Sequence, residues 1–309
     1  MTSRDGALLS IIIPSYNQGT FIADTIDSIL SQDYRPIEVL VIDGASKDGT
    51  VAVLESYRGA PELTWWSEPD GGVVDAVNKG LARARGEVIG IQSSDDVYLP
   101  GAFSAVMQDL AADPGLALVY GDVEYIDAQS RVTGRTNLPR FDFHEYVGKL
   151  SFIPQPAAFF TAAGARAAGR WREDVSYAAD AEFFLRLLAG SKAKKIDRLV
   201  ARYRYHEGQR DKAGLRIAKD WERSIESYAR GTDRSLRRFA RSGIALTRYH
   251  YTPEGDWVRR TLDLYRAIAI NPALLRRREI RAERELIPGR YPIWRLLSRL
   301  KRLLGFNPR

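Results

Sequence analysis

Two adjacent carboxylates, Asp95 and Asp96, follow a short apolar segment at residues 88–91 and two serines. A short apolar run that is bounded by glycine and by polar residues is typical of a buried strand. Ligands of open α/β sheets bind just beyond the carboxyl ends of such strands. Neighbouring carboxylates repel each other unless a cation or hydrogen-bond donors lie between them, and their oxygens suit Mg²⁺ and Mn²⁺. The pair therefore indicates a divalent-cation site for a phosphate-bearing substrate, and the alternative is a solvated turn that caps the next helix.

Other predicted strand ends also carry amide or carboxylate side chains, namely Asn17, Asp43 and the acidic segment 70–75. The residues between these strands have helical spacing, and strands that alternate with helices indicate parallel βαβ units. Because parallel strands end at one edge of a sheet, we expect these side chains to share one site with the aspartate pair. No G-x-G-x-x-G motif follows the first strand, so a dinucleotide site is not expected.

Further elements are predicted beyond the aspartate pair. The pattern favours helices at 101–113 and 180–188 and strands at 116–125 and 195–205. Residues 131–143 are interpreted as an irregular connection. Residues 153–160 are interpreted as an edge strand, because prolines at 154 and 156 cannot serve a central one. From residue 215 onward the pattern is helical and rich in arginine.

The composition is that of an ordinary globular protein. The chain has 309 residues, 45% of them hydrophobic, which is enough for a sizeable core. It has no cysteine, which excludes disulfides, thiolate metal sites and cysteine nucleophiles. The apolar run near the N-terminus, residues 7–13, is too short for a signal peptide or a membrane span. We therefore expect a cytoplasmic protein.

The net charge of +7 is unevenly distributed along the chain. Residues 1–191 carry 15 Lys and Arg against 26 Asp and Glu, whereas residues 192–309 carry 31 against 13. This asymmetry suggests an acidic ligand or a membrane partner for the basic part, or simply two oppositely charged halves that attract each other.

Four sequence segments, taken in order, resemble glycosyltransferase family 2: SIIIPSYNQGTFIADTIDSILSQDY, IEVLVIDGASKDGT, SEPDGGVVDAVNKGLARARGEVIGIQSSDD and YAADAEFFLRL. Members of this family are inverting sugar transferases of GT-A fold. The resemblance covers about residues 8–206 and implies an α/β protein with a Rossmann-like, mostly parallel sheet flanked by helices. It implies a nucleotide-sugar-binding and catalytic domain at 1–210, followed by a basic helical region at 211–309. The Q-x-x-R-W signature of processive members is missing, so a non-processive bacterial type is expected.

The resemblance also assigns roles to the donor-site residues. Pro14, Ser15 and Asn17 would line the nucleotide pocket, and Asp43 would accept a hydrogen bond from the base. Asp75 would lie by the ribose or donor sugar, Asp95 would face the ribose, and Asp96, in the place of the family's DxD signature, would bind the metal. Two alternatives stay open from the residues themselves. Asp43 could form a turn beside Gly44, and Asp75 could stabilise the start of its helix.

Two further residues match functional positions of the family. Asp180 occupies the place of the catalytic base, although an aspartate ahead of a helix could instead be an N-cap. His206 matches a second metal ligand, although a lone histidine is more often structural. The chain departs from the family where relatives often have a histidine before Gln155, since here proline stands at position 154. This leaves the acceptor contacts undefined.

The combined prediction is a metal-dependent inverting glycosyltransferase, with Mn²⁺ or Mg²⁺ as cofactor. It would move one sugar from a nucleotide-diphosphate sugar, with UDP favoured, to a hydroxyl of a glycan or lipid-linked acceptor in surface polysaccharide synthesis. One alternative is a metal-dependent nucleotidyltransferase, but residues 15–20 offer no Lys or Arg for a triphosphate. The other is a non-catalytic module for a nucleotide sugar or nucleic acid, but no basic strand with interleaved aromatics is present for nucleic acid. The oligomeric state stays open.

The last predicted element is an amphipathic helix at the C-terminus. Residues 290–306 place isoleucine and leucine on one face and arginine and lysine on the other, with Trp294 near the boundary. This pattern is typical of a helix that lies in a membrane interface, so we expect peripheral attachment to an anionic membrane through residues 290–309. The alternative is a stripe that packs on the protein itself or forms a dimer seam.

Overall fold

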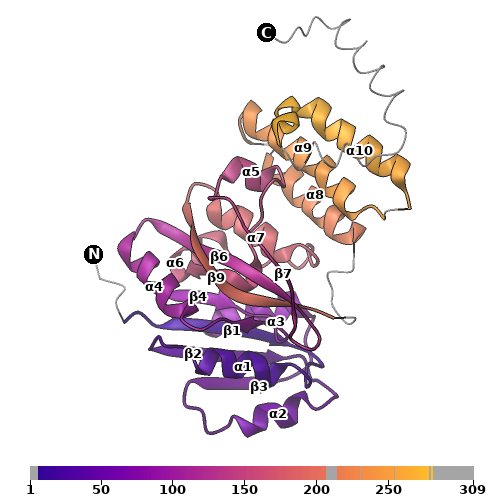
Figure 1. Cartoon of the computed structure of the whole chain (residues 1–309). Coiled ribbons are helices and arrows are strands. Elements are labelled where there is room, and N and C mark those ends of the chain that lie inside the picture. Colours follow the sequence, from indigo (N-terminus) through magenta and orange to yellow (C-terminus); the bar gives the residue numbers. More distant parts are fainter. Residues whose placement is uncertain (1–5, 207–213, 230, 254, 278–279, 281–309) are drawn as a thin grey trace, which may run out of the picture. The chain divides into compact units, whose positions relative to one another are not determined.

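The computed structural model describes residues 6–206, 214–229, 231–253, 255–277 and 280 (Figure 1). The chain divides into two compact units. The first contains residues 1–146 and 150–213, and the second contains residues 147–149 and 214–309. The sequence predicts a division after residue 210. The predicted amphipathic helix at 290–306 lies outside the described residues.

The first unit is built on a sheet in which nine strands of the described chain take part. The strands are β1 Leu9–Ser15, β2 Ile37–Asp43, β3 Leu63–Ser67, β4 Val88–Ile91, β5 Val97–Tyr98, β6 Leu116–Asp127, β7 Val132–Arg135, β8 Ala158–Thr161 and β9 Lys192–Tyr205. Their order is β3-β2-β1-β4-β8-β6-β9-β5, and β7 pairs with β6. The first four strands in this order run parallel, as the βαβ pattern predicts. Their carboxyl ends therefore lie at one edge of the sheet.

Helices cover both faces of this sheet. They are α1 Ile22–Leu30, α2 Thr50–Ser56, α3 Val73–Arg83, α4 Ala102–Ala112, α6 Ala162–Ala168 and α7 Ala179–Leu188, with a 3₁₀ turn at Gln155–Ala157. The short helix α5 Phe143–Val147 follows β7 in the chain. Ile22, Ile26 and Ile29 share one side of α1 and are fully buried, in one core cluster with residues of α2, α4 and β1. On the opposite face, Gly80 of α3 packs on Ile12, and Phe183 of α7 lies with its ring centroid 5.2 Å from that of Phe160.

Two segments differ from the sequence prediction. The prediction that residues 153–160 form an edge strand is wrong, because β8 lies inside the sheet and pairs antiparallel with both β4 and β6. Pro154 precedes the 3₁₀ turn and Pro156 is within it, so both lie before β8. The strand itself contains no proline, and its backbone N–H groups can all donate to the neighbouring strands. The predicted irregular connection at 131–143 is also wrong in part, since β7 forms a hairpin with β6.

The second unit is helical, as the pattern after residue 215 predicts. It contains α8 Leu215–Ala229, α9 Arg234–Tyr251, α10 Trp257–Ile270 and a 3₁₀ turn at Pro272–Arg276. Asp233 and Asp256 cap α9 and α10 by accepting hydrogen bonds from backbone N–H groups in the first turn. Fully buried Trp221, Leu246 and Leu264 contribute one residue from each helix to its core. Within the described part of the chain, no helix combines the length and apolar character that a membrane crossing requires.

The close packing of α3 on β1 generates a stability prediction. A Cβ at Gly80 would overlap the Cγ2 of Ile12 and lie 3.2 Å from its Cγ1. Gly→Ala inside a helix normally stabilises by about 1 kcal/mol, but overpacking costs about 1–3 kcal/mol. We expect Gly80→Ala to lower the free energy of unfolding, measured by urea denaturation. Gly59→Ala is the control, because a Cβ there meets nothing within 4 Å. A stabilised Gly80→Ala protein would contradict the packing.

Candidate functional site

The ends of β1, β2 and β3 lie side by side at the carboxyl edge of the sheet. In register, Ser15 is opposite Asp43, and Asp43 is opposite Ser67. The neighbouring strand β4 ends at Ile91, opposite Ile12 and three residues before the end of β1, and the N–H of Gln92 donates to the carbonyl of Ile12 at 2.9 Å. The parallel topology thus gathers the side chains that the sequence places at separate strand ends, and the aspartate pair follows directly.

Asp43 forms the centre of a closed hydrogen-bond cluster. Its side chain is fully buried and accepts bonds from the N–H of Ser46 at 2.9 Å, the hydroxyl of Ser46 at 2.5 Å and the hydroxyl of Ser67 at 2.6 Å. The Ser46 hydroxyl in turn accepts from the N–H of Asn17 at 2.8 Å, and the Asn17 carboxamide accepts from the N–H of Lys47 at 2.9 Å. This cluster fixes the loop after β1 against the loop after β2. Asn17 has φ of +53°, a conformation that asparagine tolerates better than most residues.

The aspartate pair is held between β4 and the end of β9. Asp96 is 1% exposed, and its Oδ1 accepts from the N–H of Arg204 at 2.8 Å. Asp95 Oδ2 lies 2.9 Å from Nε2 of His206. The histidine that the family resemblance assigns to the metal therefore contacts Asp95, whereas the same resemblance assigns the metal to Asp96.

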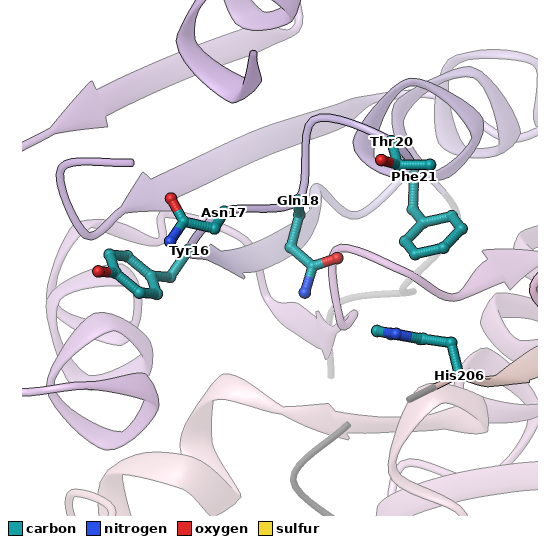
Figure 2. A pocket seen from close by; sticks show the side chains of 6 residues that line it. All are labelled: Tyr16, Asn17, Gln18, Thr20, Phe21 and His206. Atoms are coloured by element: carbon teal, nitrogen blue, oxygen red, sulfur yellow. The ribbon is translucent and has the colours of Figure 1, made fainter. Parts of the chain in front are cut away.

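A pocket of about 410 Å³ opens beside His206. It is lined by Tyr16, Asn17, Gln18, Thr20, Phe21 and His206. Figure 2 shows that the loop after β1 supplies all of these side chains except His206, and that Gln18 extends from this loop toward the side of the pocket where the histidine lies. Tyr16 is 58% exposed, which is high for an aromatic side chain next to predicted nucleotide-site residues. Pattern reasoning missed Tyr16, Gln18 and Phe21, although their position in the first strand–helix loop is itself a signal.

Tyr98, two residues after Asp96, is a buried tyrosine. Burial and the negative charge of Asp96 raise the pKa of Tyr98 well above its ordinary value. The Tyr98 hydroxyl is therefore protonated and neutral at every physiological pH, and it adds no further negative charge next to Asp96.

The two remaining predicted residues lie at helix starts. Asp75 is in the first turn of α3, where a hydrogen bond from the N–H of Gly71 and the ammonium of Lys79, 3.2 Å away, lower its pKa. Asp180 is in the first turn of α7, whose N-cap is Ala178, so Asp180 is not the N-cap of this helix. Burial and the charges of Asp180 and Glu182 raise the pKa of Tyr146 well above its ordinary value.

The donor atoms near the pocket suit a divalent cation. Among the described residues no three His, Asp or Glu side chains form a ready-made metal cluster. The carboxylate of Asp95 and the imidazole of His206 are nevertheless an oxygen–nitrogen pair of the kind that Mn²⁺ accepts. Metal ions that bind nucleotides commonly take one or two protein ligands and complete their coordination with phosphate oxygens and water. The residues present therefore fit a metal that binds together with its substrate.

Comparison with known proteins places the chain in a family. A sequence profile of Glycosyl transferase family 2 matches residues 10–168. The chain belongs to glycosyltransferase family 2. This confirms the family that the sequence motifs indicate.

Family 2 relatives differ in length and in what is known of them. Chondroitin synthase of Pasteurella multocida is 28% identical over 194 residues, which are 62% of this chain and 20% of that protein. Chondroitin synthase of Escherichia coli is 27% identical over 80% of this chain and 34% of its own length. The chain thus spans a fifth to a third of these synthases. An uncharacterized glycosyltransferase of Mycobacterium tuberculosis is 32% identical over 58% of this chain and 68% of its own length.

Solved structures share the fold. TarS residues 1–349 of S. aureus, in complex with UDP-GlcNAc, superposes with a TM-score of 0.63 at 15% identity, covering 85% of this chain and 81% of that one. The mannosyltransferase PcManGT of Pyrobaculum calidifontis, in complex with GDP-Man and Mn²⁺, gives a TM-score of 0.60 at 21% identity, covering 97% and 81%. These likenesses confirm the predicted GT-A fold.

The Asp43 cluster generates the second prediction. Asp43→Asn would place an amide NH₂ or a weaker acceptor opposite three donors, and an unsatisfied buried group costs about 1–3 kcal/mol. We expect a free energy of unfolding lowered by that amount, together with weaker binding of nucleoside diphosphates. Glu68→Gln, an exposed change just after β3, is the control. If Asp43→Asn loses nucleotide affinity at unchanged stability, Asp43 contacts the base and does not anchor the loops.

Proposed function

We propose that this chain is a metal-dependent inverting glycosyltransferase. It moves one sugar from a nucleotide-diphosphate sugar to a hydroxyl of a glycan or lipid-linked acceptor in surface polysaccharide synthesis. The observation that carries this proposal is the contact between Asp95 and His206 beside the pocket of the β1–α1 loop, in a chain of family 2. A cytoplasmic location, with peripheral membrane attachment through residues 290–309, is part of the proposal.

The donor nucleotide occupies the loop pocket in this proposal. The exposed ring of Tyr16 offers a stacking surface for the base, and Asn17 lines the pocket beside it. Pro14 and Ser15 are the buried last residues of β1, directly before this loop, and they would support the nucleotide site from there. The cluster centred on Asp43 holds this loop in place, so Asp43 contributes to base binding at least through the backbone that it fixes. UDP-sugars are the favoured donors. Asp75 lies on the α3 side, toward the ribose or the sugar.

Asp96 and His206 would hold Mn²⁺ or Mg²⁺ in this proposal, and Asp95, which contacts His206, would face the ribose. When bound, the ion stabilises the negative charge that develops on the leaving diphosphate. The protein's contribution would be to hold Asp96 and the Asp95–His206 pair in largely buried positions, where each electrostatic interaction is stronger than in water.

Asp180 acts as the general base. It takes the proton from the acceptor hydroxyl as the oxygen attacks the anomeric carbon from the face opposite the diphosphate. Attack from that face inverts the configuration in one displacement, and no covalent sugar–enzyme intermediate forms. The partly exposed position of Asp180 at the start of α7 allows an acceptor to reach it.

A donor survey tests the proposed function. Incubation with a panel of UDP-, GDP- and CDP-sugars, Mn²⁺ and candidate acceptors should release a nucleoside diphosphate from one donor class, and the release should stop with EDTA. NMR of the product should show the opposite anomeric configuration to the donor. Release of pyrophosphate from a nucleoside triphosphate would instead indicate a nucleotidyltransferase, and binding with no turnover of any donor would indicate a binding module.

The base assignment gives a sharper prediction. Asp180→Asn should lower kcat roughly a hundredfold or more, the usual scale for loss of a general base, while the KM for the donor stays unchanged. Glu173→Gln, which alters an exposed carboxylate on the segment before α7, is the matched control and should keep its kcat. Full turnover by Asp180→Asn would remove Asp180 from the mechanism.

A further inference from the structure

Arg204 is a buried cation next to the aspartate pair. It lies on β9 two residues before His206, and its side chain is 1% exposed. A buried guanidinium loses its hydration, so it destabilises the fold unless hydrogen bonds and charges compensate. Asp24, which forms an ion pair with it at 3.2 Å, has a side chain that is 58% exposed, so water screens that pair. Stability alone is therefore a weak reason for an arginine at this position.

The same residue holds both aspartates. The Nε of Arg204 donates to the backbone carbonyl of Asp95 at 2.7 Å, and its backbone N–H donates to Oδ1 of Asp96 at 2.8 Å. The side chain thus fixes the peptide of one aspartate while the main chain fixes the carboxylate of the other. With its backbone fixed in this way, Asp95 presents Oδ2 to His206.

Arg204 also supports His206 through an aromatic ring. The guanidinium carbon lies 4.8 Å from the centroid of Phe21, and the centroids of Phe21 and His206 are 4.9 Å apart. Phe21 precedes α1, and Asp24 is in the first turn of α1, so the cation anchors the start of that helix. The Nη1 of Arg204 donates to the hydroxyl of Ser130 at 2.8 Å, in the turn between β6 and β7. One guanidinium therefore connects three segments around the pocket.

We propose that Arg204 is the positioning residue of the metal–diphosphate site. It sets the geometry of the Asp95–Asp96 turn and of His206, and its positive charge offsets the repulsion between the two carboxylates before a cation binds. This inference rests on the proposed function. Lysine cannot replace it, because a single ammonium cannot donate in the three fixed directions that the planar guanidinium uses here.

The test uses the full chain with Arg204→Lys and, as matched control, Arg202→Lys. Arg202 is on the same strand and pairs with Glu124 at 2.9 Å, outside the aspartate cluster. Mn²⁺ affinity in the presence of UDP is measured by electron paramagnetic resonance and calorimetry, and unfolding is measured by thermal denaturation. Partners that orient metal ligands typically contribute 10–100-fold to metal affinity. We therefore expect Arg204→Lys to weaken Mn²⁺ binding about tenfold or more, and Arg202→Lys to leave it unchanged.

A second variant covers the case in which Arg204→Lys does not fold. Asp24→Asn changes an exposed residue and weakens the anchoring of the guanidinium, so Mn²⁺ affinity should shift in the same direction by a smaller factor. Wild-type Mn²⁺ affinity in folded Arg204→Lys, or in Asp24→Asn when Arg204→Lys is unfolded, would overturn the positioning role while leaving the proposed function intact. Wild-type protein that binds neither Mn²⁺ nor UDP would overturn both.

Discussion

The repulsion between two adjacent, largely buried carboxylates is the constraint on which the site depends. Asp95 and Asp96 are 8% and 1% exposed, so water screens their charges poorly. The fold compensates with groups from one segment, since the N–H of Arg204 at the end of β9 donates to Asp96 and the imidazole of His206, the next residue after β9, contacts Asp95. A strand that runs beside β6 and ends next to the aspartate turn is therefore as necessary to the site as the aspartates themselves.

The sheet topology explains how residues so far apart meet. Asp24 and Arg204 are separated by 180 positions, and Asp95 and His206 by 111. The parallel strands β1 to β4 bring the polar loops to one edge, and the antiparallel strand β8 between β4 and β6 extends the sheet so that β9 can reach the same edge. If β8 were an edge strand, β6 and β9 would have no neighbour through which to join β4.

Sequence patterns were sufficient for the elements whose signal is local. The βαβ alternation predicts the parallel half of the sheet, and the polar residues at strand ends predict the edge at which those residues meet. The position of β8 is not predictable in the same way, because the two prolines precede the strand and the local sequence does not show where the strand begins. The roles of Ser46 and Ser67 around Asp43, and of Arg204 around Asp95, depend on pairs of residues that are distant in sequence. The run RYRY at residues 202–205 contains two arginines, and the local sequence does not show that the guanidinium of Arg204 is buried.

The closed cluster around Asp43 has a consequence for donor choice. A TarS structure that holds UDP-GlcNAc and a PcManGT structure that holds GDP-Man share this fold, so the fold as such does not select the base. In this chain the Asp43 carboxylate is fully buried and accepts three hydrogen bonds from serines, so the proposed base contacts would come from the backbone and exposed side chains of the loops that it anchors. Asn17 joins those loops, and Tyr16 is the exposed side chain beside it. In the proposed function, base selection would then depend on how the loop after β1 is held against the loop after β2, to which the Asp43–Ser46–Asn17 chain of hydrogen bonds contributes.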